Sequence, residues 1–335
     1  MTGGRRFDTV EIAAGRLSAR VMAYGASLRD LRLKGHAAPL VLGFEEDDHY
    51  LDQSVFHGAI CGRFANRIRW GRFVLDGERF ETDLNESGTH TLHGGGQGTW
   101  ARIWKIADSG PDFVTLTLRD EHGANGFPGT LDIACTWRVL PPATLALELV
   151  ATTDRPTLCS LAAHPYFNLD DGGASDIRDH RLMIEAAAYL PVDAEGIPTG
   201  AVLPSAETPF DFVVPRPIGL EWEAETFAFD NSFCLSAHPT TLRRAAWVQG
   251  ARTGLEMEVW TTEPGLQFFD GNLPPRGVPG LDGIRYGARA GFCLEPQGWP
   301  DSPNHAYFPQ SVLRPGETYR QQTQYRFRLS EPHEP

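Results

Sequence analysis

A single glutamate, Glu295, follows an apolar run with strand character and precedes a turn rich in proline, amide and tryptophan side chains (residues 292–304). A carboxyl group at the end of a buried strand loses hydration, so its pKa rises toward the range that suits proton transfer unless nearby donors stabilise the anion. Glu295 is therefore a candidate catalytic acid or base. The alternative is an edge carboxylate that caps a turn, and this segment alone does not separate the two.

A histidine, His164, lies in a segment of apolar and aromatic residues (residues 161–169). Burial disfavours the imidazolium form, whereas a nearby carboxylate favours it, so a suitable carboxylate would poise His164 to donate a proton near neutral pH. The alternative is a core histidine that hydrogen-bonds to the backbone, the commoner role for a lone histidine on an apolar strand.

The segment GRFANRI (residues 62–68) places three polar side chains in an otherwise apolar setting. An extended chain would direct Arg63 and Arg67 to one face and Asn66 to the other, so at least one buried polar group needs a partner. A hydroxyl group of a ligand is one candidate partner. A local carboxylate that pairs with a buried arginine is the alternative.

The segment THTLHGGGQG (residues 89–98) brings His93 to a run of glycines. Glycines let a ligand approach the backbone closely because they carry no side chain. The segment lacks the GxxxxGK[ST] pattern and any helix signal after it, so it does not predict a phosphate-binding loop. A surface turn with an incidental imidazole is the alternative for His93.

Two further polar side chains, Asp230 and Gln267, lie between aromatic residues (segments 227–233 and 260–269). A polyhydroxylated ring needs acceptors for its hydroxyls and a flat apolar surface for its C–H face, and these segments offer both. Taken one at a time, each residue is also consistent with an ordinary turn carboxylate or strand glutamine.

Alternation of apolar and polar residues is the dominant pattern and predicts β-strands, with no long amphipathic helix. Residues 72–80 predict two short strands joined by a tight turn at Asp76–Gly77. Leu145, Leu147 and Leu149 fall on one face of a further strand. Other strands are expected within residues 10–33, 113–118, 131–139, 255–260 and 319–329. The prediction is an all-β fold, a large antiparallel sandwich whose sheets pack face to face.

The 335 residues include 35 Gly and 25 Pro, and 41% are hydrophobic, which fits a β-rich unit with many turns and a sizeable core. The Pro/Gly-rich stretch 272–280 predicts a long loop rather than a linker, because strand patterns continue on both sides without a change in composition. We therefore expect residues 1–335 to form one domain.

The formal net charge of −13 disfavours nucleic acid and acidic membrane surfaces as partners, whereas a small neutral ligand is indifferent to it. The five cysteines are scattered and have no metal-ligand spacing, which predicts free thiols in a reducing compartment. No signal peptide or membrane span is apparent, so we expect a cytoplasmic protein.

Six of these segments, taken together and in order, resemble the aldose 1-epimerase (galactose mutarotase) family. The shared motifs are GRxANRI (62–68), LHGG (92–95), HxYFNL (164–169), FDxxF (229–233), TTxPGxQF (261–268) and ExQxxPDxxN (295–304). The resemblance implies a β-supersandwich and an enzyme that interconverts the α and β anomers of free aldoses, such as galactose and glucose, without a cofactor or metal. The implied partner is a monosaccharide, and we expect a monomer or a weak homodimer.

The resemblance also implies residue roles. Glu295 corresponds to the base that takes the proton of the anomeric hydroxyl, and His164 to the acid that protonates the ring oxygen, with the two side chains facing each other across the sugar ring. The residues implied to hold sugar hydroxyls are Asn66, Arg67, His93, Asp230 and Gln267. The family often carries FDHNF where this chain has Asn231 and Ser232, which leaves neighbouring sugar contacts open.

Two other functions remain as alternatives from the sequence. A glycoside hydrolase would use a carboxylate pair drawn from Glu295, Asp301 and Asp230, but the prominent proton donor in this chain is a histidine. A non-catalytic sugar-binding module on the same scaffold would lack Glu295 or His164, and both are present.

Overall fold

The computed structural model describes residues 6–52, 56–219, 221–222, 225–275 and 277–329. Strands dominate these residues, and every pairing between named strands is antiparallel. The α-helix within the described residues is α1 (Asp48–Asp52), far shorter than a bilayer requires, and none of the described helices could span one. The prediction of an all-β fold without long helices is confirmed.

Three sheets form the body of the molecule. The nine-stranded sheet has the order β18 (Arg216–Pro217), β15 (Arg181–Ile184), β22 (Arg243–Gln249), β23 (Glu256–Thr261), β27 (Tyr319–Arg328), β12 (Thr144–Thr153), β11 (Leu131–Leu140), β10 (Phe113–Asp120) and β9 (Lys105–Ser109). The five-stranded sheet has the order β17 (Leu203–Pro204), β16 (Ala188–Tyr189), β21 (Asp230–Cys234), β24 (Gly265–Phe269) and β25 (Cys293–Gln297). The three-stranded sheet contains β1 (Thr9–Ala14), β2 (Leu17–Met22) and β3 (Ser27–Leu33).

Short elements connect these sheets. The two-stranded pairs are β4 (Ile60–Cys61) with β14 (Ala162–Ala163), β5 (Arg67–Ile68) with β8 (Thr91–Leu92), β6 (Arg72–Leu75) with β7 (Glu78–Glu81), β13 (Thr157–Leu158) with β26 (Val312–Leu313), and β19 (Glu221–Trp222) with β20 (Glu225–Thr226). Five single turns of 3₁₀-helix are η1 (Arg69–Gly71), η2 (Thr99–Ala101), η3 (Ala124–Gly126), η4 (Leu281–Gly283) and η5 (Ser302–Asn304), counted over the described residues.

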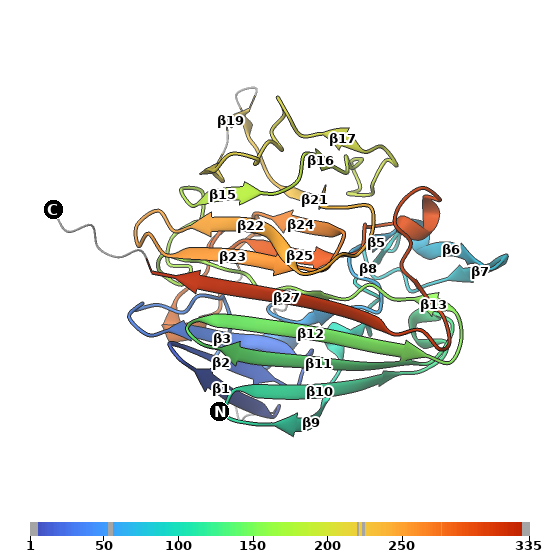
Figure 1. Ribbon diagram of the computed structural model, residues 1–335, viewed down its shortest axis with the longest axis horizontal. Helices are drawn as coiled ribbons and strands as arrows, with labels where there is room; N and C mark the ends of the chain where they lie inside the picture. The colour runs from blue at the N-terminus through green and yellow to red at the C-terminus, as the bar shows by residue number, and fades with distance from the viewer. Residues whose placement is uncertain (1–5, 53–55, 220, 223–224, 276, 330–335) are drawn as a thin grey trace.

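The core lies between the nine-stranded sheet and the two smaller sheets behind it. In Figure 1 the nine-stranded sheet faces the viewer, with β1–β3 behind β10–β12 and with β24 and β25 behind β22 and β23. One apolar cluster joins all three sheets, from Ile12 on β1 through Leu149 on β12 to Leu294 on β25. Long regular strands such as β11 and β12 contribute alternate residues to it because successive side chains of a strand point to opposite faces.

The strand predictions agree with this arrangement. Leu145, Leu147 and Leu149 are all buried on β12, as the alternation predicted. Asp76 and Gly77 both have positive φ, 51° and 85°, and join β6 to β7 in the predicted hairpin. The described part of residues 272–280 forms a loop without strands, as expected. The five cysteines are free thiols, and four of them are buried.

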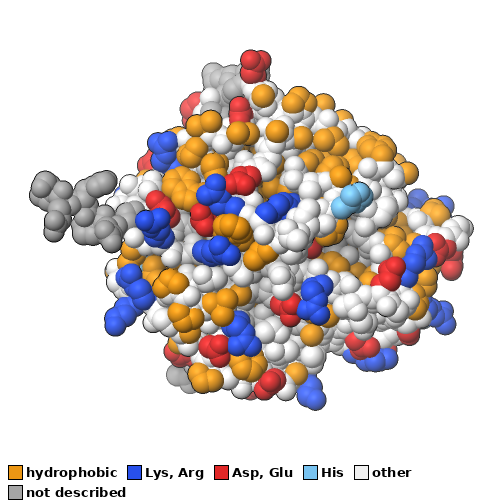
Figure 2. All heavy atoms as spheres, viewed as in Figure 1, with side chains coloured by type: hydrophobic (Ala, Val, Ile, Leu, Met, Phe, Trp, Pro, Cys, Tyr) orange, Lys and Arg blue, Asp and Glu red, His pale blue; other side chains and the backbone are white. Residues whose placement is uncertain are grey.

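Charges of both signs are interspersed over the outer face of the nine-stranded sheet (Figure 2). Ion pairs link strands of this sheet, including Arg244 with Glu258 and Arg320 with Glu148, and Arg244 also pairs with Glu185, directly after β15. Exposed pairs of this kind contribute little to stability. They give this face no single-signed patch that would attract a charged polymer.

Candidate active site

All seven residues predicted to act on a sugar line one cavity of about 230 Å³. They come from sequence positions as far apart as Asn66 and Glu295. The full lining is Phe56, Asn66, Arg67, Leu92, His93, His164, Tyr166, Asp230, Gln267, Phe269, Asn272, Leu273 and Glu295. The cavity therefore combines polar groups with aromatic and aliphatic surface, a composition that suits a monosaccharide.

Two neighbouring strands supply Gln267 and Glu295. The residues sit directly opposite each other in the antiparallel pair β24–β25, so their side chains project from the same face of the sheet. Asp230 begins the next strand, β21, which pairs with the other edge of β24. Regular strand geometry thus sets the spacing of three of the seven side chains.

Glu295 is a buried carboxyl group, with 2% of its surface exposed. Its Oε2 has no hydrogen-bond partner among the described residues. Burial raises the pKa of Glu295 well above its usual value; the negative charge of Asp230 raises it further, and Arg67 partly opposes the shift. The result is a carboxyl group that binds a proton readily and presents an unused acceptor.

His164 lies beside Glu295, with its Nε2 3.6 Å from the Oε1 of the carboxylate. Burial lowers the pKa of His164 to about 4. The imidazole is stacked on Tyr166, with ring centroids 5.0 Å apart, and meets His93 edge-on at 5.5 Å. These rings hold the imidazole in one plane and keep the pair away from bulk water.

The expectation that the two side chains face each other across a sugar ring is wrong. A separation of 3.6 Å leaves no room for a ring between Nε2 and the carboxylate. Both groups must instead approach the same edge of a sugar. The anomeric oxygen and the ring oxygen share that edge because both are bonded to C1, so the side-by-side arrangement still offers one group to each oxygen.

Asn66 and His93 are held together by reciprocal contacts between their loops. The backbone N–H of Asn66 donates to Nδ1 of His93 at 3.1 Å, and the N–H of His93 donates to the carbonyl of Asn66 at 3.0 Å. Burial lowers the pKa of His93 well below its usual value, and His164 and Arg67 lower it further. The neutral ring accepts at Nδ1, so its Nε2 carries the hydrogen that is free to donate.

A chain of charged and polar groups crosses the cavity floor. Arg67 makes a bidentate contact with Glu86, with N–O distances of 2.8–3.1 Å, and its other nitrogen lies 3.5 Å from Asp230. The amide nitrogen of Gln267 donates to Asp230 at 2.7 Å, which leaves the buried Oε1 of Gln267 without a partner among the described residues. Gln267 and Glu295 therefore both present acceptor oxygens that a sugar hydroxyl can satisfy.

Comparison with known proteins agrees with this geometry. A sequence model described as Aldose 1-epimerase matches residues 8–326. The chain is 35% identical to galactose mutarotase from Rattus norvegicus over 98% of this chain and 96% of the relative, and 37% identical to aldose 1-epimerase from Escherichia coli over 92% and 91%. The chain belongs to the aldose 1-epimerase family. It is accordingly an isomerase that interconverts sugar anomers.

Solved structures of other members of the aldose 1-epimerase family have the same fold. A GalM/aldose epimerase homologue from C. elegans superimposes with a TM-score of 0.90 and 30% identity, covering 97% of this chain and all of that one. Galactose 1-epimerase from Lactobacillus acidophilus gives a TM-score of 0.82 and 25% identity, covering 97% and 99%. The predicted β-supersandwich of the galactose mutarotase type is confirmed.

The glycoside hydrolase alternative is not favoured for this family member. Asp301, one of its three proposed carboxylates, does not line the cavity. Its Oδ1 accepts hydrogen bonds from the backbone of Arg69 and from the amide of Asn304, at 2.9 and 2.6 Å. Asp301 thus fixes the turn that follows β25, and its Oδ2 lies 3.3 Å from Nε2 of His305.

One expectation about the arginines is wrong for this epimerase. Arg63 and Arg67 do not share a face, because residues 62–68 do not form one extended strand: β4 ends at Cys61, β5 starts at Arg67, and Asn66 has a φ of 64°. Arg63 is fully buried and pairs with Asp120 at 2.7 Å, which is the alternative foreseen for a buried arginine. Arg67 and Asn66 both reach the cavity.

The glycines after His93 pack against protein rather than a ligand. A Cβ atom on Gly94 would lie 2.0 Å from the carbonyl oxygen of Gly62, and one on Gly95 would touch Asn125. Neither glycine lines the cavity. They permit the close contact between two loops that brings His93 next to Asn66. The glycines therefore allow one loop to approach another, and not, as predicted, a ligand to approach the backbone.

The residues where this chain departs from the family motif do not line the cavity either. Asn231 and Ser232 are both buried on β21, with Asp230 before them on the same strand. The departure therefore leaves the described lining of the site unchanged. The strand keeps Asp230 at the cavity edge, where 47% of its side chain is exposed.

Several residues that line the cavity or orient its side chains escaped prediction from the sequence. Glu86 orients Arg67, yet it lies in a loop segment that carries no chemical pattern. Tyr166 supports His164 and was part of the HxYFNL motif, so its aromatic character two residues beyond a candidate acid was an available signal. Phe56, Leu92, Phe269, Asn272 and Leu273 complete the walls.

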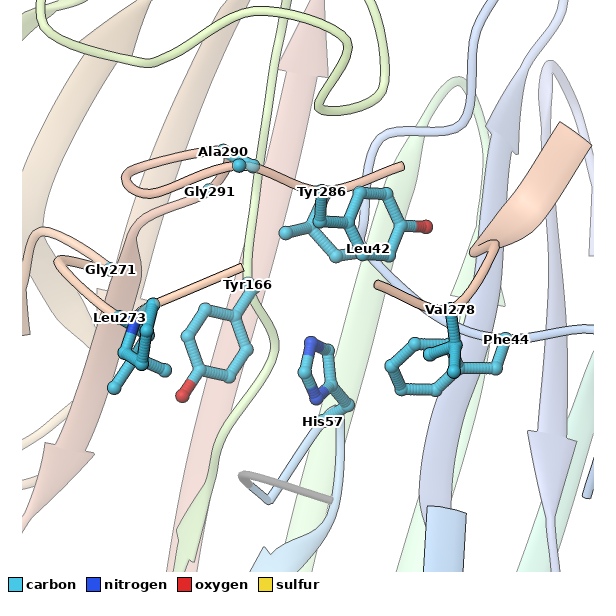
Figure 3. A pocket seen from close by; sticks show the side chains of 12 residues that line it. Leu42, Phe44, His57, Tyr166, Gly271, Leu273, Val278, Tyr286, Ala290 and Gly291 are labelled. Carbon is cyan, nitrogen blue, oxygen red and sulfur yellow. The ribbon is translucent and has the colours of Figure 1, made fainter. Parts of the chain in front are cut away.

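A second, smaller cavity of about 40 Å³ lies on the other side of Tyr166. Tyr166 and Leu273 line both cavities. Figure 3 shows His57 between the rings of Tyr166 and Phe44, with centroid separations of 4.7 and 4.9 Å. His57, Tyr166 and His164 therefore form a continuous column of rings in which Tyr166 is supported on both faces.

Three groups at the site could in principle hold a soft metal ion. One ligand atom each from His164, Cys293 and Glu295 lies within 4.8 Å of the others. Coordination would require the thiolate of Cys293. Burial raises the pKa of this thiol well above its usual value, and Glu295 raises it further, so the thiol holds its proton, which metal binding would have to release.

Proposed function

We propose that this protein interconverts the α and β anomers of free aldoses such as galactose and glucose by opening and reclosing the sugar ring. One observation carries the proposal: a buried carboxyl group and a buried imidazole lie 3.6 Å apart on one cavity, and all five side chains predicted to hold sugar hydroxyls line the same space. The separation suits two oxygens bonded to one carbon.

In the proposed mechanism Glu295 accepts the proton of the anomeric hydroxyl while His164 donates a proton to the ring oxygen. The C1–O5 bond breaks and C1 becomes an aldehyde carbon. Rotation about C1–C2 presents the other face of the aldehyde, and the ring closes with the two proton transfers reversed. No proton is gained or lost over the cycle, so no co-reactant is required.

The pair needs one transferable proton, and its pKa shifts are consistent with that requirement. Burial disfavours both charged forms, raising the pKa of Glu295 and lowering that of His164. At pH values between the lowered pKa of His164 and the raised pKa of Glu295, the pair binds a single proton. In the first form the proton is on the carboxyl group and the imidazole is neutral. In the second form the proton is on the imidazole, which makes the pair a carboxylate and an imidazolium. We propose that a bound sugar, by donating a hydroxyl to Glu295, favours the second form.

The remaining side chains would hold the other hydroxyls. Asn66, Arg67, His93, Asp230 and Gln267 offer donors and acceptors around the cavity, and the aromatic walls offer a surface for the C–H face of the ring. The link from Glu86 through Arg67 to Asp230 keeps these groups oriented before a sugar binds. Arg67 would also stabilise negative charge that develops on a sugar oxygen.

Polarimetry on freshly dissolved α-D-galactose and α-D-glucose tests the proposal. The purified protein should accelerate mutarotation, and Glu295→Gln and His164→Gln should each lower kcat by about 10²–10⁴-fold. Glu148→Gln, which changes a carboxylate on the outer face of the large sheet, is the matched control and should keep wild-type activity. Absence of acceleration on common aldoses would refute the proposal.

We also propose a cytoplasmic location and a neutral monosaccharide as the small-molecule partner. Five free thiols fit a reducing compartment, and the net charge of −13 disfavours binding to nucleic acid. Equal activity on phosphorylated and free aldoses would contradict the assignment of neutral sugars.

A further inference from the structure

Cys293 lies directly behind the imidazole of His164. Its Sγ is 3.4 Å from Nδ1 of His164, within hydrogen-bond distance for sulfur, while Nε2 of the same ring lies 3.6 Å from Glu295. Cys293 and Glu295 are two residues apart on β25, so both project from one face of the strand. A single strand therefore contacts both nitrogens of His164.

Water cannot readily take the place of this thiol. Cys293 is completely buried and does not line the sugar cavity; it packs with Leu42, Tyr166 and Ala290. A buried ring nitrogen without a partner would lose a hydrogen bond that it makes in the unfolded chain. The sulfur of Cys293 is the partner that the structure provides for Nδ1.

A thiol differs chemically from the groups that commonly support a catalytic histidine. A carboxylate or a carbonyl oxygen can only accept a hydrogen bond, so it stabilises the imidazolium form. A thiol donates weakly and accepts weakly. It can therefore donate to a bare Nδ1 or accept from a protonated Nδ1, and it favours neither charge state strongly.

We propose that Cys293 is a positioning residue for proton transfer: its sulfur hydrogen-bonds to Nδ1 in each charge state of His164, so that Nε2 stays directed at Glu295 and at the ring oxygen of the sugar. The inference rests on the proposed function. The S–H bond stays intact throughout, and the transferred proton passes only between Nε2 and the sugar. The weak partner keeps the imidazolium acidic enough to release that proton.

Titration of His164 by NMR in a series of Cys293 variants tests the inference without measuring activity. Cys293→Ala removes the acceptor for Nδ1–H, Cys293→Ser supplies a better one, and Cys293→Asp supplies a charged one. We expect the pKa of His164 to rise in the order Ala, Cys, Ser, Asp. The other ionisable groups around the ring, Glu295, His93 and Tyr166, are unchanged in all four proteins.

Kinetics of the same proteins provide the second test. We expect Cys293→Ala to lower kcat about tenfold with KM little changed, as for the loss of one hydrogen bond, and Cys293→Ser to retain most of kcat. The acid limb of the pH–rate profile should move in the same order as the NMR pKa values. Cys135→Ala, which removes a fully buried thiol from β11, is the control. It should change neither kcat nor the acid limb of the pH–rate profile.

The outcomes separate this inference from the proposed function. A wild-type protein that does not accelerate mutarotation would refute the proposed function, whereas the NMR series would still report on the contact between Cys293 and His164. Equal losses of kcat in the Ala and Ser variants, or a His164 pKa that is the same in all variants, would overturn the inference. If the Asp variant does not fold, the order Ala, Cys, Ser remains decisive.

Discussion

Burial decides the behaviour of three ionisable side chains that line the cavity. Glu295, His164 and His93 all have pKa values displaced toward their neutral forms, with loss of hydration as the largest cause. Such displacements are common at sites that bind and release protons. In this site the oxygens of Glu295 and Gln267 that have no partner among the described residues add a second signature, because a buried acceptor at a cavity can accept a hydrogen bond from a bound hydroxyl.

The contact between Glu86 and Arg67 should control how tightly the sugar binds. Glu86→Gln removes one charge from a partly buried bidentate pair and lets Arg67 move toward Asp230, which disturbs the contact of Asp230 with Gln267. We expect KM to rise about tenfold with kcat nearly unchanged. Steady-state polarimetry measures both constants.

Glu148→Gln is again the control for loss of one carboxylate from an ion pair, here an exposed one. If KM changes by the same factor in Glu86→Gln and Glu148→Gln, or changes in neither variant, the role of Glu86 in orienting Arg67 is contradicted.

Glu263 should make stability depend on pH independently of the sugar site. Burial raises the pKa of Glu263 to about 8, and Arg243 only partly opposes the shift. A carboxyl group whose pKa is higher in the folded state binds its proton more tightly there, so its contribution to stability is complete below the unfolded pKa of about 4.5 and is lost as the pH rises through about 8. Glu263→Gln removes the ionisation.

We therefore expect the Glu263→Gln variant to gain stability over the wild type as the pH increases from about 5 to about 9, by about 1–5 kcal/mol at the upper end. Urea unfolding at several pH values measures the difference. A difference in unfolding free energy that stays constant with pH would show that Glu263 keeps an ordinary pKa in the folded protein.

Strands and loops contribute to the site in different ways. The strands β24 and β25 set Gln267 opposite Glu295 by regular pairing, which requires only the register of two strands. The loops around Asn66 and His93 reach the cavity through irregular backbone, with φ values of 64° and 51° at these two residues. Non-glycine residues at positive φ are uncommon and are retained where surrounding contacts hold them.

The contact between the loop of Gly94 and the loop of Gly62 should be intolerant of any side chain. A Cβ on Gly94 would meet backbone at 2.0 Å, at a φ of 82°. We expect Gly94→Ala to cost about 3 kcal/mol of unfolding free energy and to reduce activity by displacing His93. Chemical denaturation and polarimetry measure the two effects.

Gly77 offers a matched control for backbone strain alone. It has a similar φ of 85°, but a Cβ atom added there would have nothing within 4 Å. Gly77→Ala should cost about 1 kcal/mol and leave activity intact. Equal costs at the two positions would mean that strain, and not the contact with Gly62, accounts for the glycine at position 94.

The protein as a whole carries a net charge of −13, and its outer face mixes charges of both signs (Figure 2). A neutral sugar does not respond to this field, whereas an anionic one is repelled. We expect kcat/KM for galactose to stay within about twofold between about 0.01 M and 1 M salt, over which screening lengths fall from about 30 Å to 3 Å.

A phosphorylated aldose serves as the comparison. Any turnover of it should increase with salt as repulsion is screened. A strong salt dependence for galactose would indicate that charged groups move or rearrange when the neutral sugar binds.

Much of this fold follows from local pattern. Alternation along residues such as Leu145, Leu147 and Leu149 was sufficient to predict a buried strand face, because side-chain direction in a strand depends only on position along the chain. The Asp76–Gly77 turn was predictable for a similar reason, since the dipeptide tolerates the positive φ angles that the hairpin requires. The chemistry of Glu295 and His164 was also visible in their residue types and surroundings.

Only the tertiary structure decided how these groups meet. It placed His164 beside Glu295 rather than across a ring from it, separated Arg63 from Arg67, and recruited Glu86 from a segment without a distinguishing pattern. It also set the sulfur of Cys293, two residues before Glu295, against Nδ1 of His164. Local sequence determines which way a backbone can bend and which side chains avoid water. The distance between side chains more than a hundred residues apart depends instead on how sheets and loops pack against each other, and a single segment does not contain that information.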